Sequence, residues 1–226
     1  MKITFYGHAT FEVKLGDSTL LFDPFFTDNP LHDNFDLNSL NPDWILASHG
    51  HGDHVADIEA ISKSSNAKLI SNYEIVNWFD EKGVKGHPIN HGGKYSFDFG
   101  TVKYVNAIHT SSMPDGANGG DPGGFVIWNA DQCFYFAGDT ALTRDMELIP
   151  MTCPKLDVAI LPIGDNFTMG YEDAAIAAEF IKCDIIIGCH YDTFGYIKID
   201  KSKAIEAFRA KNKTLLLPNI GETIEI

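Results

Sequence analysis

Ser48-His49-Gly50-His51-Gly52-Asp53-His54 decides the fold and the chemistry of this 226-residue chain. It places three imidazoles and one carboxylate directly after an apolar run. No single helix face can gather these four side chains, whereas a tight loop loosened by two glycines can. Imidazoles and carboxylates that converge in this way are costly to hold together unless a cation neutralises them. The stretch therefore predicts a metal site.

Further landmarks follow one another along the chain: Gly7-His8-Ala9, Leu21-Phe22-Asp23-Pro24, His109, Gly138-Asp139-Thr140 and a late apolar strand that ends at His190. With the H-x-H-x-D-H loop, they resemble the metallo-β-lactamase superfamily over nearly the whole chain. The segments Gly7-His8-Ala9-Thr10, His91-Gly92-Gly93 and 161–170 further resemble a bacterial and archaeal family of metal-dependent hydrolases, which is similar to the ascorbate-phosphate lactonases and the N-acyl phosphatidylethanolamine phospholipases. The resemblance implies an α/β fold, a four-layer αββα sandwich of two mixed sheets with outer helices.

Length and composition agree with one hydrolase domain over residues 1–226, because 44% hydrophobic residues can fill a sizeable core. No apolar run reaches the roughly 18 residues that would indicate a transmembrane helix. The first residues read as a strand rather than a signal peptide, so we expect a cytoplasmic protein. Four cysteines without C-x-x-C spacing predict free thiols.

The net charge of −14, from 31 acidic and 17 basic residues, argues against a nucleic-acid partner. A polyanion binder needs a basic stripe that displaces counterions, and the sequence contains none. Bound divalent cations would add positive charge locally, so a small anionic ligand is not excluded. We expect a small-molecule substrate, and the sequence leaves a homo-oligomer open.

Short apolar runs separated by glycine-rich turns predict two halves, each with strands followed by helices. Expected strands are 2–6, 10–15, 19–23, 44–47, 68–70, 95–98, 101–107, 124–129, 132–137, 157–161, 185–188 and one terminal strand. Expected helices are a short one through Val55, Ile58 and Ile61, then 73–80, 172–181 and 201–210. The loop 113–124 is either a mobile flap or wall of the active site, or a surface insertion.

Seven residues are predicted metal ligands, all in loops at strand ends, where a rigid scaffold usually places functional residues. His49 and His51 alternate with glycine and point the same way, so they bind one cation together with His109. Asp53 and His54 turn toward a second cation, which His190 completes, and Asp139 bridges the two. The predicted cofactor is a pair of divalent transition-metal ions, zinc before manganese, iron or nickel.

Four more residues are expected around the ligands. Asp23 has no free place at either cation, so we expect it to hold a ligating histidine or the metal loop. His8 either lines the active site or makes a structural hydrogen bond. Asp165 and Asn166 either form the pocket wall or make a turn that caps the next helix. His8 and Asp165 are both candidates for protonating the leaving group.

Two cations about 3.5 to 4 Å apart would bridge a water and lower its pKa from 15.7 toward 7. We expect the resulting hydroxide to cleave a small ester, a lactone or a phosphodiester, as in a lactonase or phosphodiesterase. Asp53 is the predicted catalytic residue, because it would both bind metal and orient the nucleophile.

The alternative function is metal-dependent redox chemistry on the same fold, with oxygen or a persulfide as the reactant. Diiron members of the superfamily typically have glutamate where this chain has His51. Persulfide enzymes usually lack the second metal, which Asp53, His54, Asp139 and His190 provide for here. A binding protein with a degenerate site is disfavoured because every ligand position is intact. Hydrolysis is therefore the leading hypothesis.

Overall fold

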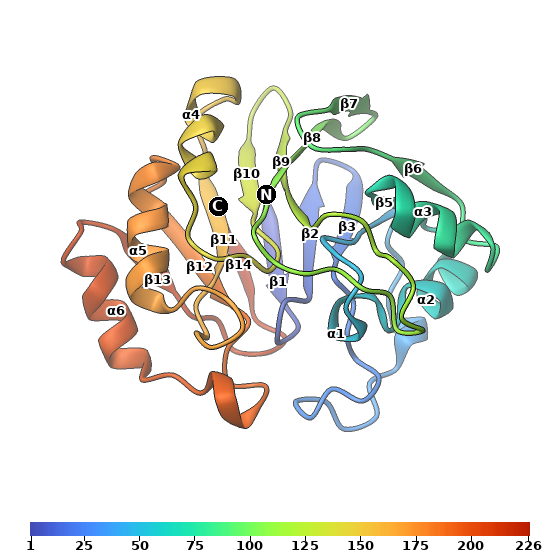
Figure 1. Cartoon of the computed structure of the whole chain (residues 1–226), viewed down its shortest axis with the longest axis horizontal. Helices are drawn as coiled ribbons and strands as arrows, with labels where there is room; N and C mark the ends of the chain where they lie inside the picture. The colour runs from blue at the N-terminus through green and yellow to red at the C-terminus, as the bar shows by residue number, and fades with distance from the viewer.

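Two seven-stranded mixed sheets pack face to face between two layers of helices in the computed structural model, which describes residues 1–226 (Figure 1). The first sheet has the order β14 (Thr223–Glu225), β1 (Lys2–Phe5), β2 (Phe11–Leu15), β3 (Ser18–Phe22), β4 (Trp44–Leu46), β5 (Lys68–Ser71) and β6 (Gly86–Pro88). The second has the order β13 (Thr214–Leu216), β12 (Ile185–Cys189), β11 (Val158–Pro162), β10 (Cys133–Phe136), β9 (Gly123–Trp128), β8 (Gly100–Asn106) and β7 (Lys94–Phe97).

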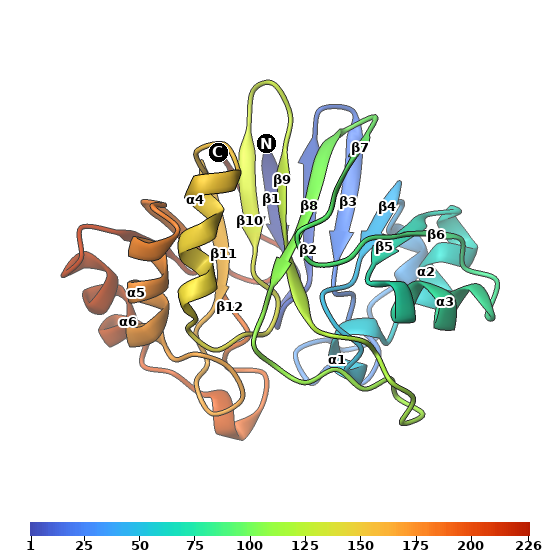
Figure 2. The same ribbon diagram turned by 45° about the horizontal axis from the view of Figure 1, so that its top comes forward.

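The helices lie on the two outer sides of this pair of sheets, as both ribbon views show (Figures 1 and 2). Beside the first sheet are α1 (Gly52–Val55), α2 (Ile58–Ser65) and α3 (Tyr73–Asp80). Beside the second are α4 (Ile149–Thr152), α5 (Tyr171–Phe180) and α6 (Lys201–Arg209). Short 3-10 turns add η1 (Leu37–Ser39), η2 (Arg144–Leu148) and η3 (Gly195–Ile197). The predicted four-layer αββα sandwich is confirmed.

The core has three layers, one between each neighbouring pair of structural layers. Aromatic rings from both sheets fill the middle layer, where Phe22 of β3 lies 4.8 Å from Phe136 of β10 between ring centroids. The outer layers are apolar residues under α2 and α3 and an alanine-rich face under α5. Close packing of this kind makes the strand ends rigid supports for the loops that follow them.

Most predicted elements are present, with three differences. β6 and α4 were not predicted, because three or four residues are too few to show a periodicity. The helix expected through Val55 and Ile61 is two helices, since the side chain of Asp57 accepts the backbone N–H groups of Phe26 and Thr27 at the break. The chain ends in two strands rather than one, and β14 returns to pair with β1.

The predicted metal ligands, together with His8 and Asp23, follow the carboxyl ends of six strands, three from each sheet. Those strands are β1, β3 and β4 in the first sheet and β8, β10 and β12 in the second. Their loops meet at one edge of the sandwich, and there the regular geometry of strands can hold side chains from both halves in contact. The four cysteines are free, as predicted, and three of them are buried. None of the six helices is long and apolar enough to cross a bilayer.

Candidate metal centre

The loop after β4 turns His49 and His51 toward each other and carries Asp53 and His54 into α1. His49 Nε2 lies 2.9 Å from His51 Nδ1. Two nitrogens on one tetrahedral zinc ion are separated by about 3.3 Å, so this pair needs little adjustment to share a cation. A side chain at Gly50 would crowd the loop after β8, because a Cβ would lie 2.7 Å from Met113 Sδ and 3.2 Å from the Ser112 backbone. The prediction that Gly52 also relieves crowding is wrong, since its Cβ position is open.

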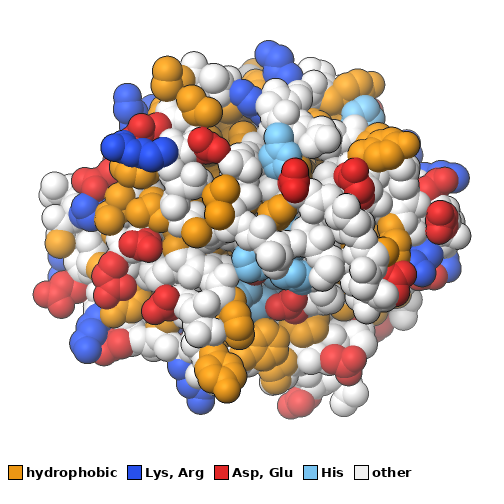
Figure 3. All heavy atoms as spheres, in the orientation of Figure 1, with side chains coloured by type: hydrophobic (Ala, Val, Ile, Leu, Met, Phe, Trp, Pro, Cys, Tyr) orange, Lys and Arg blue, Asp and Glu red, His pale blue; other side chains and the backbone are white.

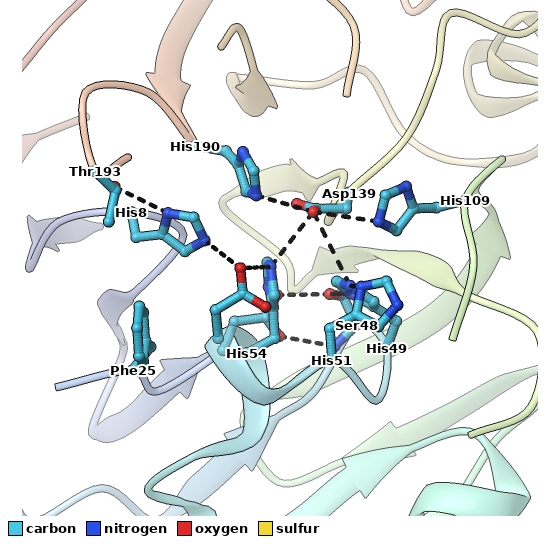
Figure 4. Close-up of polar contacts among 12 residues, drawn as sticks. His8, Phe25, Ser48, His49, His51, His54, His109, Asp139, His190 and Thr193 are labelled. Atoms are coloured by element: carbon cyan, nitrogen blue, oxygen red, sulfur yellow. Dashed lines mark hydrogen bonds and ion pairs between the residues drawn. The ribbon is translucent and has the colours of Figure 1, made fainter. Parts of the chain in front are cut away.

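Asp139 is the hub of the cluster (Figure 4). Its Oδ2 lies within 4.0 Å of the Nε2 atoms of four histidines: His49 at 4.0 Å, His54 at 3.4 Å, His109 at 3.5 Å and His190 at 3.0 Å. The side chain is 3% exposed. Burial alone would raise the pKa of Asp139, but the nearby His190 and His54 hold it well below its ordinary value. Asp139 is therefore an anion placed between residues of both sheets.

The donor atoms around Asp139 fall into two main groups whose members lie within 4.8 Å of one another, and a third group of Asp23, His49 and His54 overlaps both. One group is His49, His51 and His109, the set predicted for the first cation. The other contains Asp53, His54 and His190, the set predicted for the second, together with His8. The structure thus brings all seven predicted ligands together, from loops up to 141 residues apart between His49 and His190.

Asp23 lies beneath the cluster and is fully buried. Its carboxylate accepts hydrogen bonds from the Ser48 backbone N–H at 2.7 Å, the Ser48 hydroxyl at 2.6 Å and His54 Nδ1–H at 2.8 Å. Burial raises the pKa of Asp23, while these donors oppose the rise. Because Asp23 accepts the Nδ1 proton, neutral His54 is left with an unprotonated Nε2 that faces the cluster.

Two buried atoms of the cluster test whether the residues fit a cation. His54 Nε2 and Asp139 Oδ1 have no hydrogen-bond partner, although buried polar atoms are normally paired, and His190 Nδ1 is a third such atom. Burial would lower the pKa of His54, but Asp139 and Asp53 outweigh it and hold that pKa well above the ordinary value. The pocket therefore favours a positive charge at this point. Imidazole and carboxylate donors suit divalent transition metals, so the residues fit such an ion.

His8 also lies in this cluster. The sequence left two roles open for it, lining the active site or making a structural hydrogen bond. Its ring is fully buried, with Nε2 3.2 Å from Asp53 Oδ2 and Nδ1 2.9 Å from Thr193 Oγ1. Burial is the main cause that lowers the pKa of His8 to about 4, so the ring is neutral at pH 7. Since a carboxylate only accepts, Nε2 carries the proton and Nδ1 accepts the hydroxyl of Thr193.

The backbone of His8 is structural as well. Its carbonyl accepts the N–H of His190 at 2.7 Å, and its φ of 55° follows Gly7 at 94°. His190 and Asp23 also have positive φ, at 54° and 41°. Left-handed conformations of non-glycine residues cost energy and are concentrated at functional sites. Thr193 was missed by the sequence analysis, although its position three residues after His190 was the available signal.

Asp165 and Asn166 lie on an exposed loop and both have positive φ. Asp165 accepts the N–H of Asn166, and neither side chain contacts the histidine cluster. The alternative that they cap the next helix is wrong, because α5 begins after Gly170 with no side-chain cap. Their place in the pocket wall stays a prediction.

The loop after β8 packs as a wall against the metal loop. Met113 is 2% exposed and lies against Gly50, whose N–H donates to Ser111 Oγ. The Asn72 amide holds the loop's far end by donating to the carbonyls of Gly119 and Asp121. Of the two interpretations from the sequence, the wall agrees with these contacts.

Comparison with known proteins agrees with this geometry. Residues 2–190 match the family described as "Beta-lactamase superfamily domain". The chain is 60% identical over 227 residues to a UPF0173 metal-dependent hydrolase of Christiangramia forsetii, and 56% identical over 226 residues to one of Flavobacterium johnsoniae, with 100% of each chain covered. The structure of Igni18, a metallo hydrolase from the archaeon Ignicoccus hospitalis, matches with a TM-score of 0.89 at 30% identity, covering 99% of this chain and 97% of that chain.

The family match begins before His8 and ends at His190, so it includes every residue of the cluster. The full-length relatives carry the name of metal-dependent hydrolases, as the resemblance in the sequence predicted. This chain therefore belongs to the metallo-β-lactamase superfamily and, within it, to the UPF0173 family of metal-dependent hydrolases.

Proposed function

We propose that this chain hydrolyses an ester, lactone or phosphodiester bond of a small molecule at a centre of two divalent transition-metal ions. The observation that carries the proposal is Asp139 Oδ2, which lies among imidazoles of both donor groups at 3.0 to 4.0 Å. Bound cations would supply a water of lowered pKa and polarise the substrate oxygen. His49, His51 and His109 would hold one ion and Asp53, His54 and His190 the other, with Asp139 between them.

The exposure of the ligands indicates the side from which substrate approaches. Asp53 has a side-chain exposure of 29% and His109 of 15%, whereas His49, His54 and Asp139 are at most 3% exposed. We therefore place the approach of substrate on the side of Asp53 and His109, where His51 is also partly exposed. We assign Asp53 the role of orienting the nucleophile, because its carboxylate is an anion at neutral pH, with a pKa held low by His54 and His8 against the effect of burial.

The hydrolysis itself is tested by a panel of lactones, thioesters, carboxyl esters and bis-aryl phosphodiesters. Protein stripped of metal is reconstituted in turn with zinc, manganese, iron and nickel, and metal content is measured beside turnover. We expect metal-dependent cleavage of one bond class, reduced at least about 100-fold in Asp53→Ala, since a positioned acid or base contributes on that order. A fully metallated protein that cleaves none of these bonds would contradict the proposal.

His8 is assigned the role of fixing Asp53, because its ring spans from Thr193 to the Asp53 carboxylate. Loss of a hydrogen bond that orients a metal ligand typically reduces metal affinity or activity by about 10- to 100-fold, which is the effect expected for His8→Ala. Thr193→Val should give a smaller loss of activity. In this variant His8 Nδ1 loses its hydrogen-bond donor, and the His8 ring is no longer held in one tautomer.

Thr193→Ser is the matched control, because it keeps the hydroxyl and should retain activity. His8→Gln keeps an N–H donor of similar reach and should recover part of the loss. If His8 were instead a metal ligand, His8→Gln would retain one metal equivalent fewer than the native protein. Metal content by elemental analysis thus separates the two roles.

A further inference from the structure

Three exposed apolar side chains, called here the lip, lie on loops at the same edge of the sandwich as the metal centre. They are Ile108 at 50% exposure, Phe167 at 50% and Tyr196 at 80%. Figure 3 shows hydrophobic side chains bordering the histidines near the centre of this face, while Lys and Arg lie toward its periphery. Exposed apolar residues scattered singly are ordinary on protein surfaces. Whether these three form a binding surface therefore depends on where they lie relative to the metal centre.

Two members of the lip, Ile108 and Tyr196, are on loops that carry a ligand, and the loop of Phe167 is hydrogen-bonded to another such loop. Ile108 precedes His109, and its N–H donates to Thr140 Oγ1 at 3.0 Å, next to Asp139. The loop of Phe167 is held to the same place, since the Met169 N–H donates to the Thr140 carbonyl at 3.0 Å. The lip is therefore fixed relative to the centre by backbone hydrogen bonds.

Tyr196 lies in η3, within the loop that begins at His190. That loop is closed by the Asp192 N–H, which donates to the Ile197 carbonyl at 2.8 Å. The two loops also touch, because Gly164 packs against the His190 carbonyl so closely that a Cβ would lie 2.0 Å from it. The rings of Phe167 and Tyr196 meet edge to face, with centroids 6.3 Å apart.

Apolar surface continues from the lip toward the metal ligands. Phe194 is half-buried, with its ring centroid 5.4 Å from that of His8, and buried Phe25 lies 5.6 Å from His8 and 6.4 Å from Phe194. His8 in turn contacts Asp53 and His190. An extended apolar group that lies over the lip would thus have apolar contacts down to the edge of the centre.

The charged residues around the centre differ from those of a phosphate-binding site. No lysine or arginine contacts the side chains of the centre; Arg144 pairs with Glu147 and lies over Phe180, and Lys201 pairs with Asp192. Phosphate recognition ordinarily uses arginine or lysine. The acidic residue Asp165 is on the same loop as Phe167 and would repel an anion.

We propose that the substrate is a neutral carboxylic ester or lactone with an unbranched apolar chain, which the lip binds while the metal centre cleaves the ester bond. This inference rests on the proposed hydrolysis and names its substrate class. Water adds to the carbonyl carbon, the bond from that carbon to the alkoxy oxygen breaks, and the products are a carboxylic acid and an alcohol, joined in one molecule for a lactone. Full burial of each methylene against the lip would raise kcat/KM about fourfold.

The test measures kcat and KM for p-nitrophenyl esters of acetate, butanoate, hexanoate and octanoate, for γ-lactones of increasing alkyl chain, and for bis(p-nitrophenyl) phosphate. The esters place the chain on the acyl side and the lactones on the alkoxy side, which identifies the side that the lip contacts. We expect kcat/KM to rise with chain length through KM, and the phosphodiester to be the poorest substrate. Phe167→Ala combined with Tyr196→Ala should flatten this rise and leave metal content unchanged.

Tyr73→Ala is the matched control, because Tyr73 is 57% exposed at the start of α3 and lies outside the centre. A readout that does not depend on turnover is binding of long-chain 2-alkanones to the metal-free protein, which should weaken in the double variant. Two results would overturn the role of the lip in binding substrate while leaving the proposed hydrolysis intact. These are equal kcat/KM for all chain lengths, or an increase of kcat/KM with chain length that the double variant retains. Cleavage of the phosphodiester alone would also overturn it, and no cleavage at all would contradict the proposed function itself.

Discussion

Asp139→Ala is expected to release both metal ions rather than one. The Asp139 Oδ2 atom lies beside His49 and His109 of the first donor group and beside His54 and His190 of the second. Without its charge, each group loses an anionic partner that no other residue can replace, because Asp53 belongs to the second group and Asp23 already accepts from Ser48 and from His54 Nδ1. Loss of both ions removes several kcal/mol of transition-state stabilisation, so turnover should fall about 1,000-fold or more.

The measurement is metal content per chain after gel filtration, beside turnover on whichever substrate the panel identifies. Asp131→Asn is a suitable control, since Asp131 is exposed in the turn at the opposite end of β10 and contacts no histidine. It should keep the native metal content. Retention of one full equivalent by Asp139→Ala would show that Asp139 serves a single ion, and the two-metal proposal would need another bridge.

The sequence predicted the seven-residue cluster because its signal was local. The H-x-H-x-D-H loop fixes four donors within six residues, and the remaining three follow apolar strands whose ends a layered α/β fold brings to one edge. The alternation of apolar residues in β2 and the short apolar runs of β3 and β12 likewise located these strands to within one or two residues. Where local pattern and tertiary position agree, the prediction was accurate.

The contacts of His8 could not be predicted for the opposite reason. His8 and Thr193 are 185 residues apart, and they meet only because the ends of β1 and β12 face each other across the two sheets. The positive φ of His8 decides where its ring points, and the sequence around a histidine does not predict that conformation. Pairing of β14 with β1 is equally non-local, which explains why one terminal strand was expected and two were found.

The packing of the loop after β8 could not be predicted from the sequence for a further reason. Its glycine-rich composition indicated an irregular segment, but composition alone is the same for a loose insertion and for a loop fixed by side chains. Met113 against Gly50 and the Asn72 amide on Gly119 decide between them. Such contacts depend on shape complementarity between segments distant in sequence, which the periodicity of apolar residues does not predict.

Asp23→Asn is expected to remove one ion selectively, in contrast to Asp139→Ala. Asp23 accepts His54 Nδ1–H at 2.8 Å and therefore keeps the His54 Nε2 lone pair free for a metal. The asparagine amide would present a donor to Nδ1 whenever its oxygen faces Ser48, which favours the other tautomer. His54 Nε2 would then carry the proton and could not bind metal. Affinity for the second ion should fall about 10- to 100-fold, as for other residues that orient metal ligands.

Asp23→Ala should lower stability as well, because three buried donors on Ser48 and His54 lose their acceptor. At about 1 kcal/mol or more for each unsatisfied group, the free energy of unfolding falls by about 3 kcal/mol. Urea unfolding of the metal-free proteins measures this cost apart from metal binding. Asp43→Ala is the matched control for Asp23→Ala, and Asp43→Asn for Asp23→Asn, since Asp43 accepts one backbone N–H at the far, exposed end of β3 and β4.

The two readouts separate the roles of Asp23. Loss of stability without loss of the second ion would make Asp23 a support of the loop alone. Loss of the second ion from Asp23→Asn, with stability close to that of Asp43→Asn, would place its effect on the His54 tautomer. We expect the second result, because the introduced asparagine would still offer its carbonyl oxygen to the Ser48 backbone and would disturb chiefly the bond to His54.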